Sequence, residues 1–339
     1  MSSSSLDRVS APPIAVLGPP QTINYRVWIG GSAAMSAWLG AALLTAFWPD
    51  VPDSDWEYTR QLAVIFAAVA VGPAFALLAG QRIAPLRRIW RAIPWLIALA
   101  VLLTVWEAVT AKLALLPMPF FPPPQGVLEV FIDDWPRLLD GVFASLKLLA
   151  RGYLVGAAIG FVVGVAIGWS RAIGYWIHPI LRFVGPLPAT AWLPLAFFVL
   201  PSSLIASTFL IALATGFPVA VLTWSGVAGV SSAYYDVART LGANRWFLIV
   251  KVAIPAALPY VFVGLFMGLG NSFAVLVVAE MLGVKSGLGW YLQWAQSWAA
   301  YANMYAALFV MALICSSLIT LLFRLRDRLL SWQKGLVRW

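Results

Sequence analysis

Charged side chains are scarce in this chain. They make up 10% of its 339 residues, against roughly 25% in soluble domains, while hydrophobic residues make up 62%. The balance excludes an ordinary soluble domain and indicates an integral membrane protein. A single cysteine, Cys315, excludes an internal disulfide, and a single histidine, His178, leaves no cluster for a zinc or haem site.

Long apolar runs fill most of the chain after a Ser- and Pro-rich stretch at 1–25. That stretch has no short apolar core with a cleavage site, so it is expected to be a flexible cytoplasmic tail and not a signal peptide. A transmembrane helix needs roughly 20 mostly apolar residues. The runs predict an all-α polytopic membrane protein with about eight such helices, near 27–47, 61–80, 93–115, 150–170, 180–200, 204–225, 257–280 and 303–324.

The basic residues favour one orientation of these eight helices. With the N-terminus inside, 16 of the 22 lysines and arginines lie in the cytoplasm and six lie outside, as the positive-inside rule requires. The six outer ones are Arg60, Lys112, Arg137, Lys147, Arg151 and Lys285. Both termini are therefore expected in the cytoplasm. The net charge of +9 is explained by this topology and by anionic lipid, without nucleic-acid binding.

Glycines recur every four residues through the fourth apolar run. They are Gly152, Gly156, Gly160, Gly164 and Gly168, and Gly264, Gly268 and Gly270 form a shorter series in the seventh run. Residues four apart share one helix face, and glycine there lets a neighbouring backbone approach closely. The spacing predicts tight helix–helix contact, and a glycine face that slides during a conformational cycle is the functional alternative.

Prolines dominate the outer loop at 116–125, where they should keep the backbone extended. The following residues, 127–147, alternate apolar and charged side chains at helical spacing and predict one interfacial helix. This segment is either a simple connector or a docking ledge for an extracytoplasmic partner. Trp290, Trp294 and Trp298 are expected on the outer side of the eighth helix, as anchors at the membrane interface.

A mixed-charge segment at 231–255 separates two long uncharged stretches and lies on the predicted cytoplasmic side. Ser232 can cap a short helix, Gly242 can end it in the left-handed conformation, and Asn244 can cap a second helix running toward Pro255. Two helices meeting at a glycine would form a rigid peg, with Tyr234, Tyr235, Leu241 and Trp246 available as anchors.

The same segment resembles the EAA loop of ABC importer permeases, E-A-A-x3-G-x9-I-x-L-P. The matching residues are Asp236-Val237-Ala238, Gly242 and Val252-Ala253-Ile254-Pro255, with the register kept and Asp in place of Glu. In that family this loop docks the ATP-binding subunit. The resemblance implies an ATPase-coupling loop formed by Tyr235, Asp236, Ala238, Arg239, Leu241, Gly242, Arg245 and Pro255, with Gly242 at its corner.

Further fragments of residues 93–335 resemble the branch of type I ABC importer permeases that serves nitrate, sulfonates, taurine and bicarbonate. They include Ser145-x5-Arg151-Gly152, Pro186-x-Pro188, Ala279-Glu280-Met281-Leu282-Gly283 and Ser286-Gly287-Leu288-Gly289. The resemblance implies a permease domain over 93–325 that includes the loop 231–255. Two additional helices over 26–92 would precede it, and a basic cytoplasmic tail over 326–339 would follow it.

The resemblance also implies partners and a location. Two permease copies, by default a homodimer, would pair around a path in the bacterial inner membrane, two ATP-binding subunits would grip the loops, and a periplasmic or lipid-anchored binding protein would deliver a small anionic solute. This chain lacks the phosphate-binding G-x-x-x-x-G-K-[ST] loop, so ATP and Mg would be bound by the partner, with no cofactor and no catalysis in this chain.

A few polar residues within the apolar runs are candidates for the path or its gate. They are Asn271, Ser272, Glu280 and Met281. Glu107 and Glu280 are costly in a bilayer and are therefore functional candidates, although a structural pairing, of Glu107 with Lys112 for example, is an equal alternative. Small polar residues such as Ser272 can also bond helix to helix.

Two other classes of protein stay open at this point. An intramembrane hydrolase could use Ser272 within Gly270-Asn271-Ser272, but its base would have to be His178, which the predicted topology puts at a different depth. A secondary transporter would be expected to carry intramembrane charges and broken helices in both halves, and no internal inverted repeat is evident. The identity of the solute lies beyond the sequence.

Overall fold

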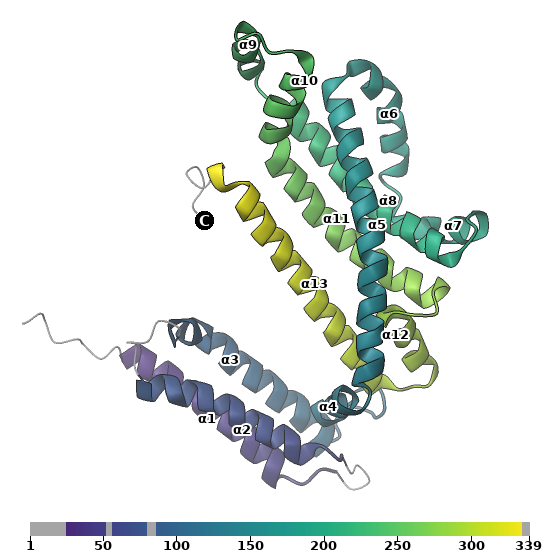
Figure 1. The fold of residues 1–339 in the computed structure, drawn as a ribbon. Helices are drawn as coiled ribbons and strands as arrows, with labels where there is room; N and C mark the ends of the chain where they lie inside the picture. Colours follow the sequence, from purple (N-terminus) through teal and green to yellow (C-terminus); the bar gives the residue numbers. More distant parts are fainter. Residues whose placement is uncertain (1–24, 52–55, 80–85, 334–339) are drawn as a thin grey trace, which may run out of the picture. The chain divides into compact units, whose positions relative to one another are not determined.

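The computed structural model describes residues 25–51, 56–79 and 86–333, and all regular structure in these residues is helical (Figure 1). The predicted tail at 1–25 lies almost entirely outside these ranges, as do the end of the tail at 326–339 and several of the basic residues used for the topology, such as Arg8 and Arg82. The described residues fall into two compact units.

The first unit comprises residues up to Pro49 and residues Arg60–Val105. It contains α1 (Tyr25–Phe47), α2 (Thr59–Ala79) and most of α3 (Leu86–Glu107). Small buried side chains such as Ala34 and Ala41 bring these helices close, and Trp38 packs edge-on against Phe66 at 5.5 Å. The first thirteen residues of the predicted permease domain 93–325 thus cluster with the predicted extra helices of 26–92, and that domain division stays a prediction.

The second unit comprises Asp50–Thr59 and everything from Trp106 onward. Its helices are α4 (Pro124–Asp133), α5 (Trp135–Trp169), α6 (Arg171–Val184), α7 (Leu193–Val199), α8 (Ser203–Ala228), α9 (Ser232–Thr240), α10 (Arg245–Phe247), α11 (Ile254–Gly283), α12 (Leu288–Ser297) and α13 (Tyr301–Leu329), with short 3-10 turns at Ala189–Trp192 (η3) and Ser331–Gln333 (η5) and π-helical turns at Ala108–Lys112 (η2) and Leu248–Ala253 (η4). Within this unit α9 and α10 lie at one end of α11, and α12 lies at the other (Figure 1).

The glycine series of α5 lies against α8 along its whole length. A Cβ placed on Gly156 would overlap the backbone of Ala212, and one on Gly164 would lie 2.6 Å from the backbone oxygen of Ala220. The same approach joins α11 to α8 at Gly264 and Gly268, whereas Gly270 has nothing within 4 Å and is not part of the contact. The predicted close packing is confirmed, and it makes α8 the central helix between α5 and α11.

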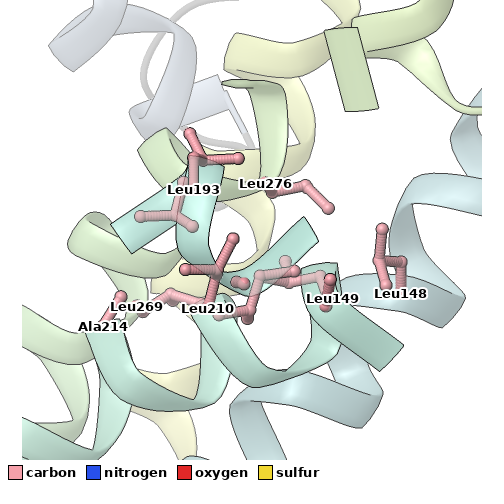
Figure 2. Packing of buried hydrophobic residues seen from close by; sticks show 11 residues of the cluster. Leu148, Leu149, Leu193, Leu210, Ala214, Leu269 and Leu276 are labelled. Carbon is pink, nitrogen blue, oxygen red and sulfur yellow. The ribbon is translucent and has the colours of Figure 1, made fainter. Parts of the chain in front are cut away.

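A buried cluster of leucines and other apolar residues fills the middle of this three-helix arrangement (Figure 2). It joins Leu148 and Leu149 of α5 to Leu210 of α8 and Leu276 of α11, and Leu193 of α7 also belongs to it. Tyr153 of α5 adds a polar link, because its hydroxyl donates to the carbonyl of Leu265 in α11 at 2.9 Å. Displacing any one of these helices would therefore disturb the other two.

Six of the eight predicted membrane spans are confirmed as helices long and apolar enough to cross a bilayer. They are Ile29–Phe47, Ala92–Lys112, Trp135–Trp169, Ser203–Ala228, Arg245–Gly283 and Tyr301–Leu329. The span predicted near 61–80 falls on α2, whose part Thr59–Phe75 is an apolar helix, and its crossing of the membrane stays a prediction.

The span predicted near 180–200 is not one unbroken helix, and its crossing of the membrane stays a prediction. The chain there forms Arg171–Val184 and Ala189–Val199, which are bent by 87° and supply a seventh span only if the pair crosses as one. Pro186 and Pro188 lie at the bend, where each lacks a backbone donor and disfavours helical conformation in the residue before it.

The interfacial helix predicted over 127–147 is also wrong in its bounds. The segment is divided at Asp134 between α4 and the 35-residue α5, which enters the apolar region without a break. Pro124 and Pro136 each lie in the first turn of one of these helices, where a missing backbone donor does no harm. The tryptophans predicted on the outer side of the eighth helix lie just before α13: Trp290 and Trp294 on α12, and Trp298 directly after it.

Candidate functional site

The charged segment at 231–255 forms a corner of two helices at one end of α11. The Ser231 hydroxyl accepts a hydrogen bond from the Ala233 N–H at 3.4 Å, so Ser231 caps α9 and the predicted cap, Ser232, is its first helical residue. Asn244 caps the second helix as predicted, because its Oδ1 accepts from the Phe247 N–H at 2.9 Å.

Gly242 forms the corner between the two helices. Its φ of +81° lies in the left-handed region, and its N–H donates to the Arg239 carbonyl at 2.9 Å. A Cβ at this position would meet nothing within 4 Å, so glycine is required by the backbone conformation and not by space. The predicted left-handed end of α9 is confirmed.

The second helix does not stop at Pro255. The α10 turn passes through η4, the π-helical turn Leu248–Ala253, directly into α11, and together they form one apolar helical segment, Arg245–Gly283. Pro255 lies in the first turn of α11, where its missing N–H is harmless. The corner at Gly242 is consequently joined to α11 by continuous helix and not by a flexible linker.

Two of the predicted coupling residues hold α9 in place. Ala238 is buried, and Tyr235 packs edge-on against Trp169 of α5 at 5.9 Å beside the cluster of Val227, Ala253 and Ala257. Burial of the phenol raises the pKa of Tyr235 above its usual value, which keeps it neutral. These contacts tie α9 to the bundle.

The other predicted coupling residues of the corner face away from the bundle. Leu241 is 82% exposed, and Trp246 beside Arg245 is 74% exposed. Asp236 and Arg239 form an exposed ion pair of 3.2 Å, which contributes under about 1 kcal/mol to stability. Large exposed apolar side chains beside an ion pair are the composition of a docking surface, and we call Asp236, Arg239, Leu241, Gly242 and Arg245 the corner surface.

Glu280 lies near the opposite end of α11 and is buried in a network of hydrogen bonds. Its Oε2 accepts from the Ser145 hydroxyl of α5 at 2.9 Å and from the Gly289 N–H of α12 at 2.8 Å. The Ser145 oxygen in turn accepts from the Leu288 N–H at 2.9 Å. This Glu280 network joins α5, α11 and α12.

Gly287 makes the Glu280 network possible. Its φ is +106°, and a Cβ there would overlap the Glu280 carboxylate. A side chain at this position would therefore be strained and would also displace the carboxylate. Three sequence fragments that were recognised separately, around Ser145, Glu280 and Gly287, thus meet at one place.

The remaining path candidates lie in different surroundings. Ser272 is fully buried, and its hydroxyl donates within α11 to the Gly268 carbonyl at 2.6 Å and to the Leu269 carbonyl at 3.1 Å. Asn271 is exposed, and Met281 is half-buried beside Glu280. The four candidates do not form one cluster, and only Glu280 and Ser272 are buried.

The structure contains two clusters of buried polar side chains that the sequence did not predict in full. Lys112 reaches Asp50 at 2.8 Å as well as Glu107 at 3.5 Å, and the Gln125 amide donates to Glu107 at 2.8 Å. The pairing of Glu107 with Lys112 is therefore confirmed, and the π-helical turn η2 between them gives the wider helical spacing that brings residues five apart together.

The second missed group surrounds Tyr291 of α12. Its hydroxyl donates to Asp134 at 2.6 Å and accepts from the Asn303 amide at 2.6 Å, while Arg137 lies over the Trp294 ring at 5.7 Å. Burial, with the bond to Asp134, raises the pKa of Tyr291, so it stays a neutral donor. No local pattern marks these residues, because they are brought together by the packing of α5, α12 and α13.

Comparison with known proteins shows the class to which this helical architecture belongs. Residues 156–334, more than half of the chain, match the family described as the binding-protein-dependent transport system inner membrane component. The chain belongs to this family. The matched residues include α8, the corner surface, α11 and Glu280.

Several relatives of known name are similar over more than half of the chain. A probable ABC transporter permease protein of Brucella melitensis biotype 1 is 32% identical over 197 residues, which cover 58% of this chain and 78% of the relative. The nitrate import permease protein NrtB of Leptolyngbya laminosa is 30% identical, covering 61% and 76%. The putative aliphatic sulfonates transport permease protein SsuC of Bacillus subtilis is 30% identical, covering 57% and 70%.

One solved structure supports the fold. A chain from the inward-facing MetNI methionine ABC transporter superposes with a TM-score of 0.50 at 16% identity, covering 59% of this chain and 98% of the solved one. The protein is thus a multi-pass membrane protein with the fold of an ABC importer permease, and the predicted resemblance is confirmed.

Proposed function

We propose that this chain is the permease subunit of an ATP-driven importer and forms a path for a small anionic solute. The observation that carries the proposal is the corner surface. A short capped helix, α9, presents exposed Leu241 beside the exposed Asp236–Arg239 ion pair, and its buried face is anchored by Ala238 and Tyr235. Such a surface fits a groove on a soluble partner.

The partner would be an ATP-binding subunit. This chain has no phosphate-binding loop of its own, so ATP and Mg would be bound by two copies of that subunit, one at each corner surface of a permease homodimer. The permease itself would take part in no bond-breaking step. Both termini would lie in the cytoplasm of a bacterium, with the corner surface on the same side of the inner membrane.

Movement at the corner surface would pass directly into the membrane region. Arg245–Gly283 is helical throughout, so a force that α9 passes through the short corner at Gly242 reaches α11 along continuous helix. The close glycine contacts then carry the displacement from α11 to α8 and from α8 to α5. ATP binding would draw the two corner surfaces together and open the path outward, and hydrolysis would reverse the motion.

Small oxyanions and sulfonates are the proposed solutes because relatives of 30% identity are named for nitrate import and for aliphatic sulfonates transport. A binding protein would deliver the solute to the outer face, near α4 and α12. Glu280 and Met281 would lie at the outer gate, where the Glu280 network joins α5, α11 and α12, and Asn271 and Ser272 would lie nearer the middle of α11.

The geometry gives no support to an intramembrane hydrolase. The Ser272 hydroxyl is occupied within α11, while His178 of α6 packs against Trp224 of α8 with ring centroids 4.3 Å apart. Neither residue contacts the other, and a serine nucleophile needs a base within hydrogen-bond reach.

The proposal is tested by purifying the full chain together with a co-expressed ATP-binding subunit. Leu241→Asp and Gly242→Asp should each lower the amount of copurified ATPase at least tenfold while the permease stays folded. The matched control is Leu282→Asp, since Leu282 is also exposed but lies about 55 Å along the continuous helix that begins at Arg245. Solute transport that persists without any ATP-binding subunit would instead establish a secondary transporter.

A further inference from the structure

An apolar groove of about 650 Å³ runs between α5, α6 and α8. Val155, Ile159 and Val163 of α5 lie along it, with Ile180 of α6 and Phe209 of α8 on its other sides. Of the described residues that line it, Arg151 is the one charged group, and Thr208 is the one other polar side chain.

The groove has the depth of one leaflet of a bilayer. Arg151 directly precedes the uncharged run 152–170, so it lies at the boundary of the apolar region. Val163 follows twelve residues later on the same helix, about 18 Å along its axis. Half of a hydrocarbon core of roughly 30 Å is about 15 Å, so the groove extends from the headgroup level to the bilayer midplane.

Two cations lie at the mouth of the groove. Arg151 also borders a neighbouring cavity of about 300 Å³, which Lys147, one helical turn earlier, borders as well. Both side chains are exposed, and neither forms an ion pair within 4 Å in the described part of the chain.

The carboxylates that border the same cavity form no ion pair with Arg151 within 4 Å. Glu280 is buried and its Oε2 is held by Ser145 and Gly289. Asp140 lies eleven residues before Arg151, about 16 Å along the helix. The mouth of the groove therefore presents a guanidinium with no ion-pair partner within 4 Å among the described residues, directly above an apolar channel.

We propose that this groove binds an anionic phospholipid, with one acyl chain lying along α5 and the phosphate on Arg151 beside Lys147. The planar guanidinium pairs with phosphate oxygens through two parallel hydrogen bonds. A helix from a second permease copy would cover the apolar walls but leave Arg151 without a counter-charge, whereas one phospholipid supplies both an apolar chain and a phosphate. This site is independent of the proposed solute and of the ATP-binding partner.

The test uses the full chain in nanodiscs of phosphatidylglycerol and phosphatidylcholine, followed by native mass spectrometry of retained lipid. The wild-type chain should retain phosphatidylglycerol roughly tenfold more than phosphatidylcholine, because both lipids carry the phosphate but the choline cation of phosphatidylcholine offsets its charge beside Arg151 and Lys147. Arg151→Gln should remove the preference, and Ile159→Trp should lower retention of both lipids by filling the groove.

Two control variants separate the site from general lipid contact. Arg137→Gln removes an exposed arginine of α5 that borders no part of the groove, and Val162→Trp enlarges an exposed side chain of α5 outside it. Both should leave retention unchanged. Equal lipid retention by the wild type and all four variants would overturn the proposal. It would also be overturned if Ile159→Trp retained its lipid but no longer formed a dimer, because the groove would then be a contact between two permease copies.

A second measurement uses only the wild-type chain, so it does not depend on whether the Ile159→Trp variant folds. Phosphatidylglycerol with a photoreactive acyl chain should label wild-type peptides that contain Ile159 or Phe209. Labelling spread evenly over exposed apolar residues of α13, such as Leu313 and Leu321, would contradict a specific site.

Discussion

The two ends of α11 carry polar groups of opposite kinds. At one end Glu280 is 1% exposed and bonded to α5 and α12, whereas at the other end Asp236 and Arg239 are exposed and bonded only to each other. Both places stand out in a sequence with few charges. The difference teaches that a charged residue in a membrane protein has one of two roles: it holds helices together, or it is available to bind another protein. The exposed fraction of the side chain distinguishes these roles.

The largest effect is expected when the Glu280 network is broken. Glu280→Ala leaves the Ser145 hydroxyl and the Gly289 N–H without their acceptor in a buried site, at a cost of about 3 kcal/mol or more. The yield of monodisperse protein and its melting temperature should both fall. Glu280→Gln keeps an acceptor oxygen and should lose less than half as much stability, so equal losses would show that the network contributes little.

A matched pair of glycines gives the next largest contrast. Gly287→Ala and Gly242→Ala both place a side chain at positive φ, which costs about 1–2 kcal/mol, but only the Gly287 Cβ would also overlap Glu280. Thermal unfolding should show a clearly larger loss for Gly287→Ala. The amount of copurified ATP-binding subunit should fall more for Gly242→Ala. If one of the two variants showed the larger loss in both measurements, the contrast between the two ends of α11 would be contradicted.

The smallest effect is expected at the ion pair of the corner surface. Asp236→Ala removes an exposed pair between residues three apart, so the free energy of unfolding should change by under about 0.5 kcal/mol. Any loss of ATPase copurification in this variant then reports a missing contact with the partner. A melting temperature lowered as far as in Glu280→Ala would mean that Asp236 holds the fold together.

Local chemistry explains which parts of the site could be predicted. The caps, the left-handed glycine and the apolar runs depend on neighbouring residues, so the corner at Gly242 was found, with an error of one residue at Ser231. The continuous helix from Arg245 into α11 was not, because a π-helical turn leaves no clear period in the sequence. Pro186 and Pro188 mark a break in the helix, but their spacing does not predict the 87° bend.

Long-range partners explain the rest. Ser145 and Glu280 are 135 residues apart, and their fragments were recognised without any sign that they meet. Asp50 joins Lys112 from a distant loop, and Tyr291 joins Asp134 across 157 residues. The lipid groove needs three helices and the bend after α6. Such sites depend on tertiary packing, which hydrophobic periodicity does not encode.

The central claim is that the corner surface is the seat of an ATP-binding subunit. Its most direct test is photo-crosslinking from a reactive amino acid placed at position 241 of the full chain, in membranes that contain the co-expressed subunit. The account predicts a product with the combined mass of permease and ATP-binding subunit, and none from the same probe at position 282. Transport that proceeds normally while position 241 yields no such product would contradict it.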